Sequence, residues 1–266
     1  KLQAAMATVA NEIDRQGLDL ARTATFNTLN PTGAVPNTQA LALAAVTGIN
    51  QRLDEMGAPR DKQRALALSP SLNASFVQGF AGLFNGQSAL TKQFGSGVMV
   101  DSLGISYSMD QNVATHTNGT QAVAGTAVAA GLSGASIACA ALAGTIPKGT
   151  VVQFPGVFAV NPQSRTSTGV LAQFVITADL LAGAVALPIS PAIVSTGAFQ
   201  NVTNNTTAAN FTIVGAANTG YQANVGFHKD AFTLACVPMW APPGGKGVID
   251  VAQESYKGMN LKITEF

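Results

Sequence analysis

The chain has 266 residues and a formal net charge of +1, and charged residues make up 10% of it, against about 25% in an average globular protein. Phosphate binding requires clustered Lys and Arg side chains, but the 14 basic residues here are dispersed and balanced by 13 acidic ones. This composition argues against a dedicated nucleic-acid binder. No apolar run is long enough for a transmembrane helix.

The N-terminal segment has the apolar periodicity of an amphipathic helix. Leu2, Met6 and Val9 recur at helical spacing, and the pattern predicts a helix over residues 2–26. No capping residue precedes this pattern, and the first residue is Lys1 rather than Met. We therefore expect the chain to be an N-terminally truncated fragment or a processed form.

Two more helices and a short strand are predicted next. Apolar spacing indicates a helix over about residues 38–55, and a short apolar strand follows at residues 65–68. Ser69 is a suitable N-cap for a third helix, because Pro70 then stands at the first helical position, where a missing N–H is tolerated. The expected buried stripe of this third helix consists of Phe76, Phe80, Leu83 and Phe84.

From about Gly95 the pattern changes to short strands separated by turn residues. Strands are predicted at residues 150–154, 157–160, 171–177, 184–189 and 211–214. This spacing is typical of a small antiparallel barrel or sandwich, and its position within an α+β chain indicates an inserted domain. We expect this domain to fold by itself, with Phe154, Phe158, Phe174 and Ile176 in its core.

The phrase FHKDAFTLACVPM near the C-terminus predicts a strand over residues 227–239, and further strands are expected within 247–266. His228 and Asp230 share one face of this strand, which suits a hydrogen bond between their side chains. No nucleophile accompanies this pair, so we interpret it as structural. An enzyme that uses His228 with Asp230 remains an alternative.

No catalytic, cofactor-binding or metal-ligating residue is expected elsewhere. Cys139 and Cys236 lack metal-ligand spacing, and we expect two buried free thiols rather than a disulfide. His116 is expected to be a turn or rim residue. The densest cluster of charged residues consists of Asp54, Glu55, Arg60, Asp61, Lys62 and Arg64. This cluster can be either a solvated turn or a subunit-contact loop.

Several long phrases resemble the major capsid proteins of tailed bacteriophages. They include AMATVANEIDRQGLDLARTATFNTLN, GAPRDKQRALALSPSLNASFVQGFAGLF, MDQNVATHTNGTQ, GVFAVNPQSRTSTGVLAQFVIT, PISPAIVSTGAFQ and FHKDAFTLACVPM. The resemblance is to the phage P-22-like coat proteins, which carry an inserted β-domain, and it covers nearly the whole chain.

The resemblance implies an α+β subunit with the Hong Kong 97-like capsid fold and an inserted antiparallel β-barrel domain. Its parts would be a partial peripheral domain (1–29 and 246–266, spine helix and returning strand), an axial domain (30–116 and 224–245) and the inserted barrel (117–223). The N-terminal arm, the extended loop and the start of the spine helix would be absent. Because such parts join neighbouring subunits, we expect this chain alone to be a monomer or small oligomer.

The implied function is self-assembly into an icosahedral shell around double-stranded DNA. The implied partners are copies of the chain in hexamers and pentamers, together with scaffolding and portal proteins. The protein would be made in the bacterial cytoplasm and reside in the virion, with no enzymatic activity, no cofactor, no membrane association and no sequence-specific DNA binding. A secreted adhesin or pilus-like β-rich binding module is the alternative, which the Thr- and Asn-rich β block suggests.

Overall fold

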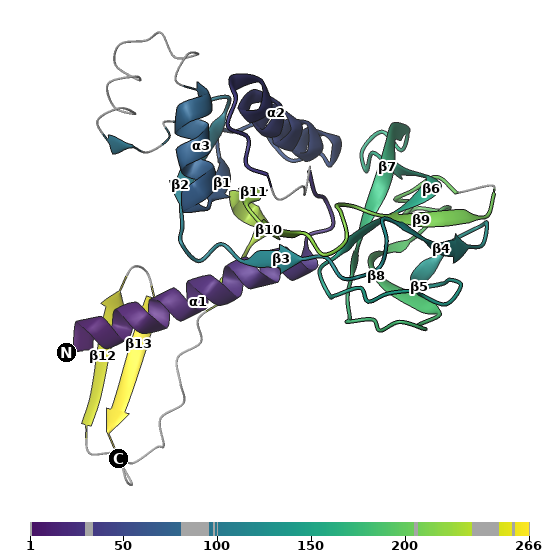
Figure 1. Cartoon of the computed structure of the whole chain (residues 1–266). Helices are drawn as coiled ribbons and strands as arrows, with labels where there is room; N and C mark the ends of the chain where they lie inside the picture. The colour runs from purple at the N-terminus through teal and green to yellow at the C-terminus, as the bar shows by residue number, and fades with distance from the viewer. Residues whose placement is uncertain are drawn as a thin grey trace.

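The computed structural model describes residues 2–29, 34–80, 96–97, 99, 101–204, 207–235, 250–256 and 259–265. The fold is mixed α+β, with few helices, many strands and a nearly closed antiparallel barrel-like sheet (Figure 1). Two separate hydrophobic cores lie in the described residues, one between helices and a small sheet and one inside the barrel. The α+β class expected from the sequence is therefore confirmed.

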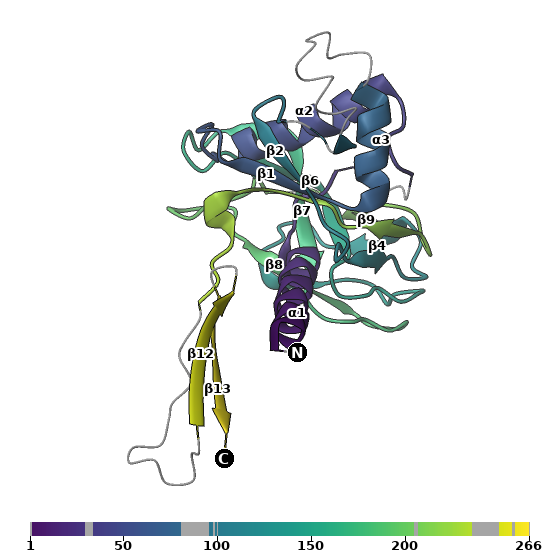
Figure 2. The same ribbon diagram turned by 90° about the vertical axis from the view of Figure 1, so that its left-hand side faces the viewer.

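The N-terminal helix α1 (Leu2–Ala24) is long and largely solvent-exposed. Its predicted range of 2–26 is close to the observed one. Figures 1 and 2 both show α1 extending away from the two cores. Its C-terminal end contacts His116 through Arg22, and its middle is bonded to Asn112 through Asn11 and Asp14. Between residues 7 and 24, Ala21 is the buried residue.

The first core lies between two helices and a three-stranded sheet. Helix α2 (Gln39–Glu55) and helix α3 (Pro70–Phe80) pack with the sheet β11-β1-β2. In this sheet, β1 (Arg64–Leu68) is central, parallel to β2 (Ile105–Met109) and antiparallel to β11 (Val225–His228).

The predicted cap and buried stripe of α3 are confirmed where the structure describes them, and α2 has a cap that was not predicted. The hydroxyl of Thr38 accepts a hydrogen bond from the N–H of Leu41, and Ser69 Oγ accepts one from the N–H of Leu72. Phe76 and Phe80 are buried with their rings in an edge contact, 5.5 Å between centroids. Leu83 and Phe84 lie outside the described residues.

A two-stranded ribbon carries the chain into and out of the barrel. Strand β3 (Thr115–Thr117) pairs antiparallel with β10 (Gly220–Gln222), so the segment between them begins and ends at the same place. Past the ribbon, Asn118 donates from its side-chain amide to the carbonyls of Val214 and Ala216. The two chain segments therefore stay bonded to each other as they enter the barrel.

The barrel has six strands in the order β4-β9-β6-β7-β8-β5. They are β4 (Ala124–Val128), β5 (Gly134–Ala138), β6 (Val151–Val160), β7 (Ser167–Ile176), β8 (Ala186–Ile193) and β9 (Ala209–Ile213). A backbone bridge between Val128 and Cys139 joins the two edge strands, so the sheet nearly closes. The strands predicted within residues 150–214 are confirmed, except that those at 150–154 and 157–160 form one continuous strand, β6, and β4 and β5 are additional.

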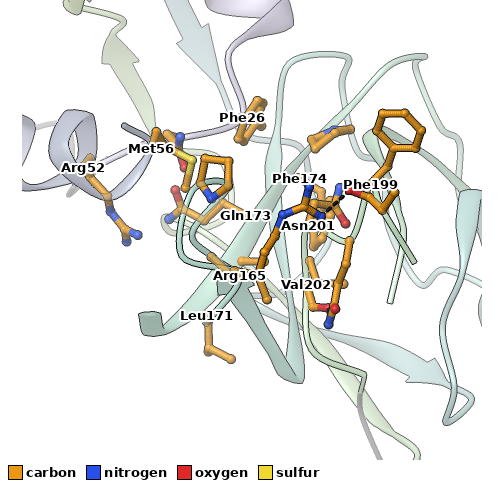
Figure 3. Close-up of a pocket in the computed structure, with 18 residues that line it drawn as sticks. Phe26, Arg52, Met56, Arg165, Leu171, Gln173, Phe174, Phe199, Asn201 and Val202 are labelled. Atoms are coloured by element: carbon orange, nitrogen blue, oxygen red, sulfur yellow. Dashed lines mark hydrogen bonds between the residues drawn. The ribbon is translucent and has the colours of Figure 1, made fainter. Parts of the chain in front are cut away.

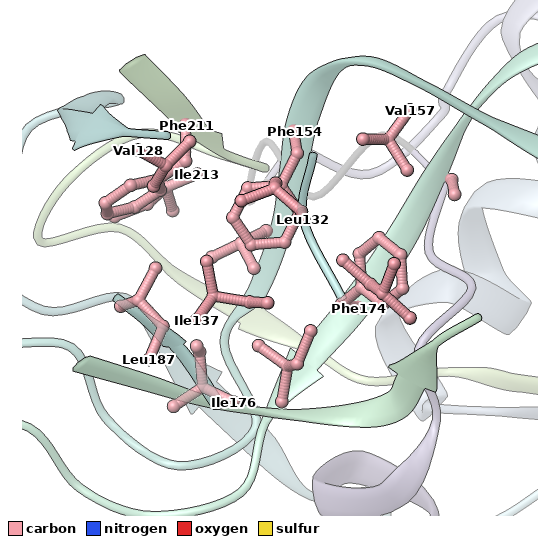
Figure 4. Close-up of a cluster of buried hydrophobic side chains, with 14 of the residues drawn as sticks. Val128, Leu132, Ile137, Phe154, Val157, Phe174, Ile176, Leu187, Phe211 and Ile213 are labelled. Atoms are coloured by element: carbon pink, nitrogen blue, oxygen red, sulfur yellow. The ribbon is translucent and has the colours of Figure 1, made fainter. Parts of the chain in front are cut away.

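The barrel core is apolar and aromatic (Figure 4). Phe154, Phe174 and Ile176 are buried in it as predicted. The prediction for Phe158 is wrong, because its side chain is only half-buried and Val157 points inward instead. The cause is a register shift between Gln153 and Phe158, which resets the alternation of inward and outward side chains within one continuous strand, β6.

The strand predicted over residues 227–239 is wrong beyond His228. Strand β11 ends there and is followed by the 3-10 turn η1 (Lys229–Ala231), and residues 236–239 lie outside the described residues. His228 ends the strand because its Nδ1 accepts a hydrogen bond from the N–H of Asp230, which caps the turn. The strands expected near the C-terminus are present as the antiparallel hairpin β12 (Asp250–Tyr256) and β13 (Met259–Glu265), which Figure 2 shows apart from the barrel.

Candidate functional site

The charged cluster singled out in the sequence lies where α2 ends and the chain turns into β1. Its members differ in exposure: Arg60, Asp61 and Lys62 are exposed, Asp54 and Glu55 are half-buried, and Arg64 is buried. The exposed members lie on one short turn, and Lys62 has a positive φ of 64°. Only part of the predicted subunit-contact loop is therefore presented to solvent.

Arg64 is the centre of this cluster, with 2% of its surface exposed. Its Nη2 donates to Oδ1 of Asp54 at 2.7 Å and to the carbonyl of Ala58 at 2.6 Å. Its Nε donates to the carbonyl of Pro59 at 2.9 Å, and its Nη1 donates to Oδ1 of Asn50 at 3.0 Å. Four acceptors therefore satisfy the guanidinium and fix the end of α2 against the first residue of β1.

The carboxylate of Asp54 joins the buried and the exposed arginine. Arg60 donates to both of its oxygens from the solvent side, and Arg64 donates from the interior. The hydrogen bond from Arg60, aided by Arg64, holds the pKa of Asp54 well below its usual range, against the opposing effect of burial. Asp54 is therefore ionised throughout the neutral range.

The neighbouring end of α2 contacts the barrel. The backbone carbonyl of Glu55 accepts a hydrogen bond from Nδ2 of Asn161, and Met56 packs against the barrel core. Gly57 has a φ of 79°, and a β-carbon there would lie 3.5 Å from the amide of Gln163. The charged turn is therefore held between the two cores.

His228 is bound to this turn. Its Nε2 lies 3.1 Å from Oδ1 and 3.3 Å from Oδ2 of Asp61, and its Nδ1 lies 3.4 Å from Oδ2 of Asp230. The expected contact with Asp230 is present, but the sequence did not reveal Asp61, because its partner is 167 positions away. The ring is 8% exposed and held between two carboxyl groups. This arrangement orients the imidazole.

His116 is not the turn or rim residue that the sequence suggested. It lies on β3 with 2% of its surface exposed, directly opposite Tyr221 in the ribbon. Its Nδ1 lies 3.1 Å from Nη1 of Arg22 on α1, and its Nε2 lies 3.2 Å from Oγ1 of Thr150. Local sequence carries no sign of this burial, because the segments that cover the ring are distant along the chain.

Two hollows flank the meeting point of α2 and the barrel. The smaller, about 290 Å³, is lined by apolar side chains including Phe26, Met56 and Leu171 (Figure 3). Phe199 stands at its edge with 87% of its surface exposed. The larger, about 1080 Å³, lies between α2, the end of α1 and the three-stranded sheet, and His116 forms part of its wall.

Within the described residues, no group of three or more His, Cys, Asp or Glu side chains could hold a metal ion. Cys139 is a free, half-buried thiol, and burial raises its pKa. Cys236 lies outside the described residues.

No helix in the described part of the chain has the length and apolar character of a membrane span. No protein-family model matches the sequence, and a search of curated proteins finds no match.

Proposed function

We propose that the chain is the major capsid protein of a tailed bacteriophage, with a Hong Kong 97-like fold, and that its copies form an icosahedral shell around double-stranded DNA. The observation that carries this proposal is the exposure of α1. Of its 23 residues, those whose side chains are described include one buried residue, Ala21. A long helix standing out from both cores suits a subunit whose neighbours complete its packing.

The physical argument concerns the stability of such a helix. Helices in proteins are stabilised mainly by packing an amphipathic face, and isolated helices are marginal in water. On α1, Val9 and Leu20 are exposed, the latter by 58%, although their spacing is that of a buried face. Ion pairs such as Glu12 with Arg15 at 2.6 Å support the helix only weakly, because they are exposed. A second chain lying on this face would supply the missing contacts.

Other exposed apolar side chains support the proposal. Leu181 and Val185 near the barrel turns, Phe199 on a barrel loop and Leu234 after η1 are all mostly exposed. Single exposed apolar residues are common, but this chain also has few charged groups with which to keep its surface soluble. Many modest interfaces of this kind can close into a shell by symmetry.

The arrangement of elements fits the domain division implied by the resemblance. The sheet β11-β1-β2 with α2 and α3 would be the axial domain, and the barrel between β3 and β10 would be the inserted domain. Helix α1 and the hairpin β12–β13 would belong to the peripheral domain. In that arrangement the exposed turn residues Arg60, Asp61 and Lys62 are available for contacts between neighbouring subunits.

The test is electron microscopy of the product of the complete open reading frame that encodes this sequence. Negative staining of the purified protein, expressed in a bacterium with any neighbouring scaffolding gene, is expected to show closed shells or curved lattices. Monodisperse monomers under every condition would overturn the proposal.

A substitution on α1 makes the test specific. Leu20→Glu is expected to abolish shells without changing the urea midpoint of the unassembled chain, because Leu20 is exposed there. Leu20→Met is the matched control, since it keeps an apolar side chain, and it should assemble. Shells of normal appearance from Leu20→Glu would show that α1 is not the contact surface.

A further inference from the structure

Three segments that are distant in sequence meet at His116. The ribbon strand β3 carries it, and the C-terminal end of α1, which lies beside β3 in Figure 1, brings Arg22. The turn before β6 brings Gly149 and Thr150. A β-carbon on Gly149 would lie 3.2 Å from the backbone oxygen of Arg22 and 3.4 Å from the ring of His116. The helix end, the ring and the barrel are therefore in direct contact.

The hydrogen bonds fix the charge state of the ring. A guanidinium can only donate, so Nδ1 of His116 must accept from Nη1 of Arg22 at 3.1 Å. The proton of the neutral ring is then on Nε2, which donates to Oγ1 of Thr150 at 3.2 Å. This pattern is available only to a neutral imidazole, because a protonated ring would direct a donor at a donor.

The charged and titratable groups around the ring are few. On α1 they are Arg22 and its ion-pair partner Asp19, which lies 2.7 Å from Nε of Arg22. On β10 the neighbour is Tyr221, whose ring centroid lies 5.4 Å away and whose pKa burial raises to about 12, so it is uncharged. Burial, reinforced by the charge of Arg22, lowers the pKa of His116, and Asn118 opposes this weakly.

We propose that His116 is a pH-sensitive pivot, which holds the C-terminal end of α1 against the ribbon and barrel when neutral and releases it when protonated. Protonation places two cations about 3.1 Å apart in a site with 2% exposure and removes the acceptor that Arg22 uses. The direction of the effect follows from linkage. The pKa of His116 is lower in the folded state than its ordinary value of 6.5. The folded state is therefore fully stable with respect to this group above pH 6.5, and it loses stability as the pH falls below 6.5.

A second contact of α1 titrates in the opposite direction. Asn112 donates from its side-chain amide to Asn11 at 2.9 Å and to Asp14 at 2.7 Å, and its N–H is bonded to Asp110. Burial, together with the charge of Asp14, raises the pKa of Asp110. Protonating Asp110 relieves its repulsion with Asp14, so acid strengthens this contact and cannot explain a release of α1.

The experiment is hydrogen exchange of the whole chain, followed by mass spectrometry between pH 5 and pH 8 and corrected for the intrinsic pH dependence of exchange. Peptides covering the end of α1 and residues 25–29 are expected to lose protection below pH 6.5, by up to about tenfold per pH unit for one proton. Peptides from β7 should stay protected, because the change is local.

Substitutions identify the group responsible. His116→Gln is expected to remove the pH dependence, since glutamine stays neutral and keeps an acceptor. His228→Gln is the matched control, because the chain has 2 histidines, and it should keep the pH dependence. Asp110→Asn should also keep it. An unchanged α1 at pH 5, or a pH dependence that persists in His116→Gln, would overturn the proposal.

A measurement on the unaltered chain covers the case in which His116→Gln does not fold. The NMR spectrum of His228→Gln contains one histidine ring and so assigns both ring signals of the unaltered chain. The midpoint of the His116 ring shift should coincide with the midpoint of the α1 exchange transition. Coincidence with the His228 midpoint instead, or with neither, contradicts the proposal.

Discussion

Nε2 of His228 lies 3.1 Å from Oδ1 of Asp61, and this contact joins the end of β11 to the charged turn before β1. Partial burial raises the pKa of Asp61, but hydrogen bonds from His228 and from the N–H of Gln63 outweigh that effect, and the net shift is downward. The carboxylate is therefore held ionised beside the ring. This contact provides a polar partner for the buried imidazole.

His228→Gln is accordingly expected to change the free energy of unfolding by less than about 1 kcal/mol, because a neutral amide can replace the imidazole as donor to Asp61. Urea unfolding measures this change. His228→Leu is the control that cannot donate, and it should be clearly less stable. A loss of bound metal in elemental analysis of His228→Gln would show that the ring has a role beyond structure.

Arg64→Met should destabilise the protein by about 3 kcal/mol, because it removes the buried guanidinium that satisfies Asp54, Asn50 and two carbonyls. Arg60→Met is the matched control, since Arg60 contacts the same carboxylate from solvent, and its urea midpoint should hardly move. Equal effects of the two substitutions would show that burial does not decide the strength of this network.

Two glycines in helices should respond in opposite directions to the same substitution. Gly79→Ala on α3 places a β-carbon 2.9 Å from Cβ of Ala42 and 3.3 Å from the backbone oxygen of Thr38, where α2 and α3 pack. We expect a loss of about 1–3 kcal/mol in urea unfolding from this overpacking, partly offset by the gain in helix propensity.

Gly17→Ala on α1 is the control for Gly79→Ala, because nothing lies within 4 Å of its added β-carbon. It should stabilise α1 locally by up to about 1 kcal/mol, seen as slower hydrogen exchange in that helix. If Gly79→Ala is also stabilising, the close approach of α2 and α3 is not maintained in solution.

The barrel should fold when residues 114–223 are expressed alone, because the ribbon brings its ends together and its core residues lie within this span, with Met56 as an outside contact. A dispersed ¹H–¹⁵N NMR spectrum and cooperative unfolding are the expected results. Phe211→Ala should cost about 3–5 kcal/mol, because the ring is fully buried, whereas the exposed Phe199→Ala should cost little. A random-coil spectrum would refute the prediction.

The sequence by itself determined the class of the fold and most of its elements, although β4 and β5 were missed and the strand predicted over residues 227–239 ends at His228. The three helices, the cap at Ser69 and the strands within residues 150–214 follow from apolar periodicity and from turn and cap residues, which are local signals. The same signals located the β block between two parts of an α+β chain. These signals could not show that Phe158 lies outside the core. A register shift within β6 reverses the alternation of inward and outward side chains without changing which residue types are present.

Only the tertiary structure decided what the polar residues do. Arg64 is buried because Asp54 and the carbonyls of Ala58 and Pro59, at and just after the end of α2, surround its guanidinium. His228 lies at the end of β11, where the charged turn places Asp61 beside the ring. His116 is buried because α1 and the barrel close over it from opposite ends of the sequence. A buried polar group must find a partner, but a side chain can be satisfied by any segment that reaches it, so its partner depends on the packing of distant segments and not on local pattern.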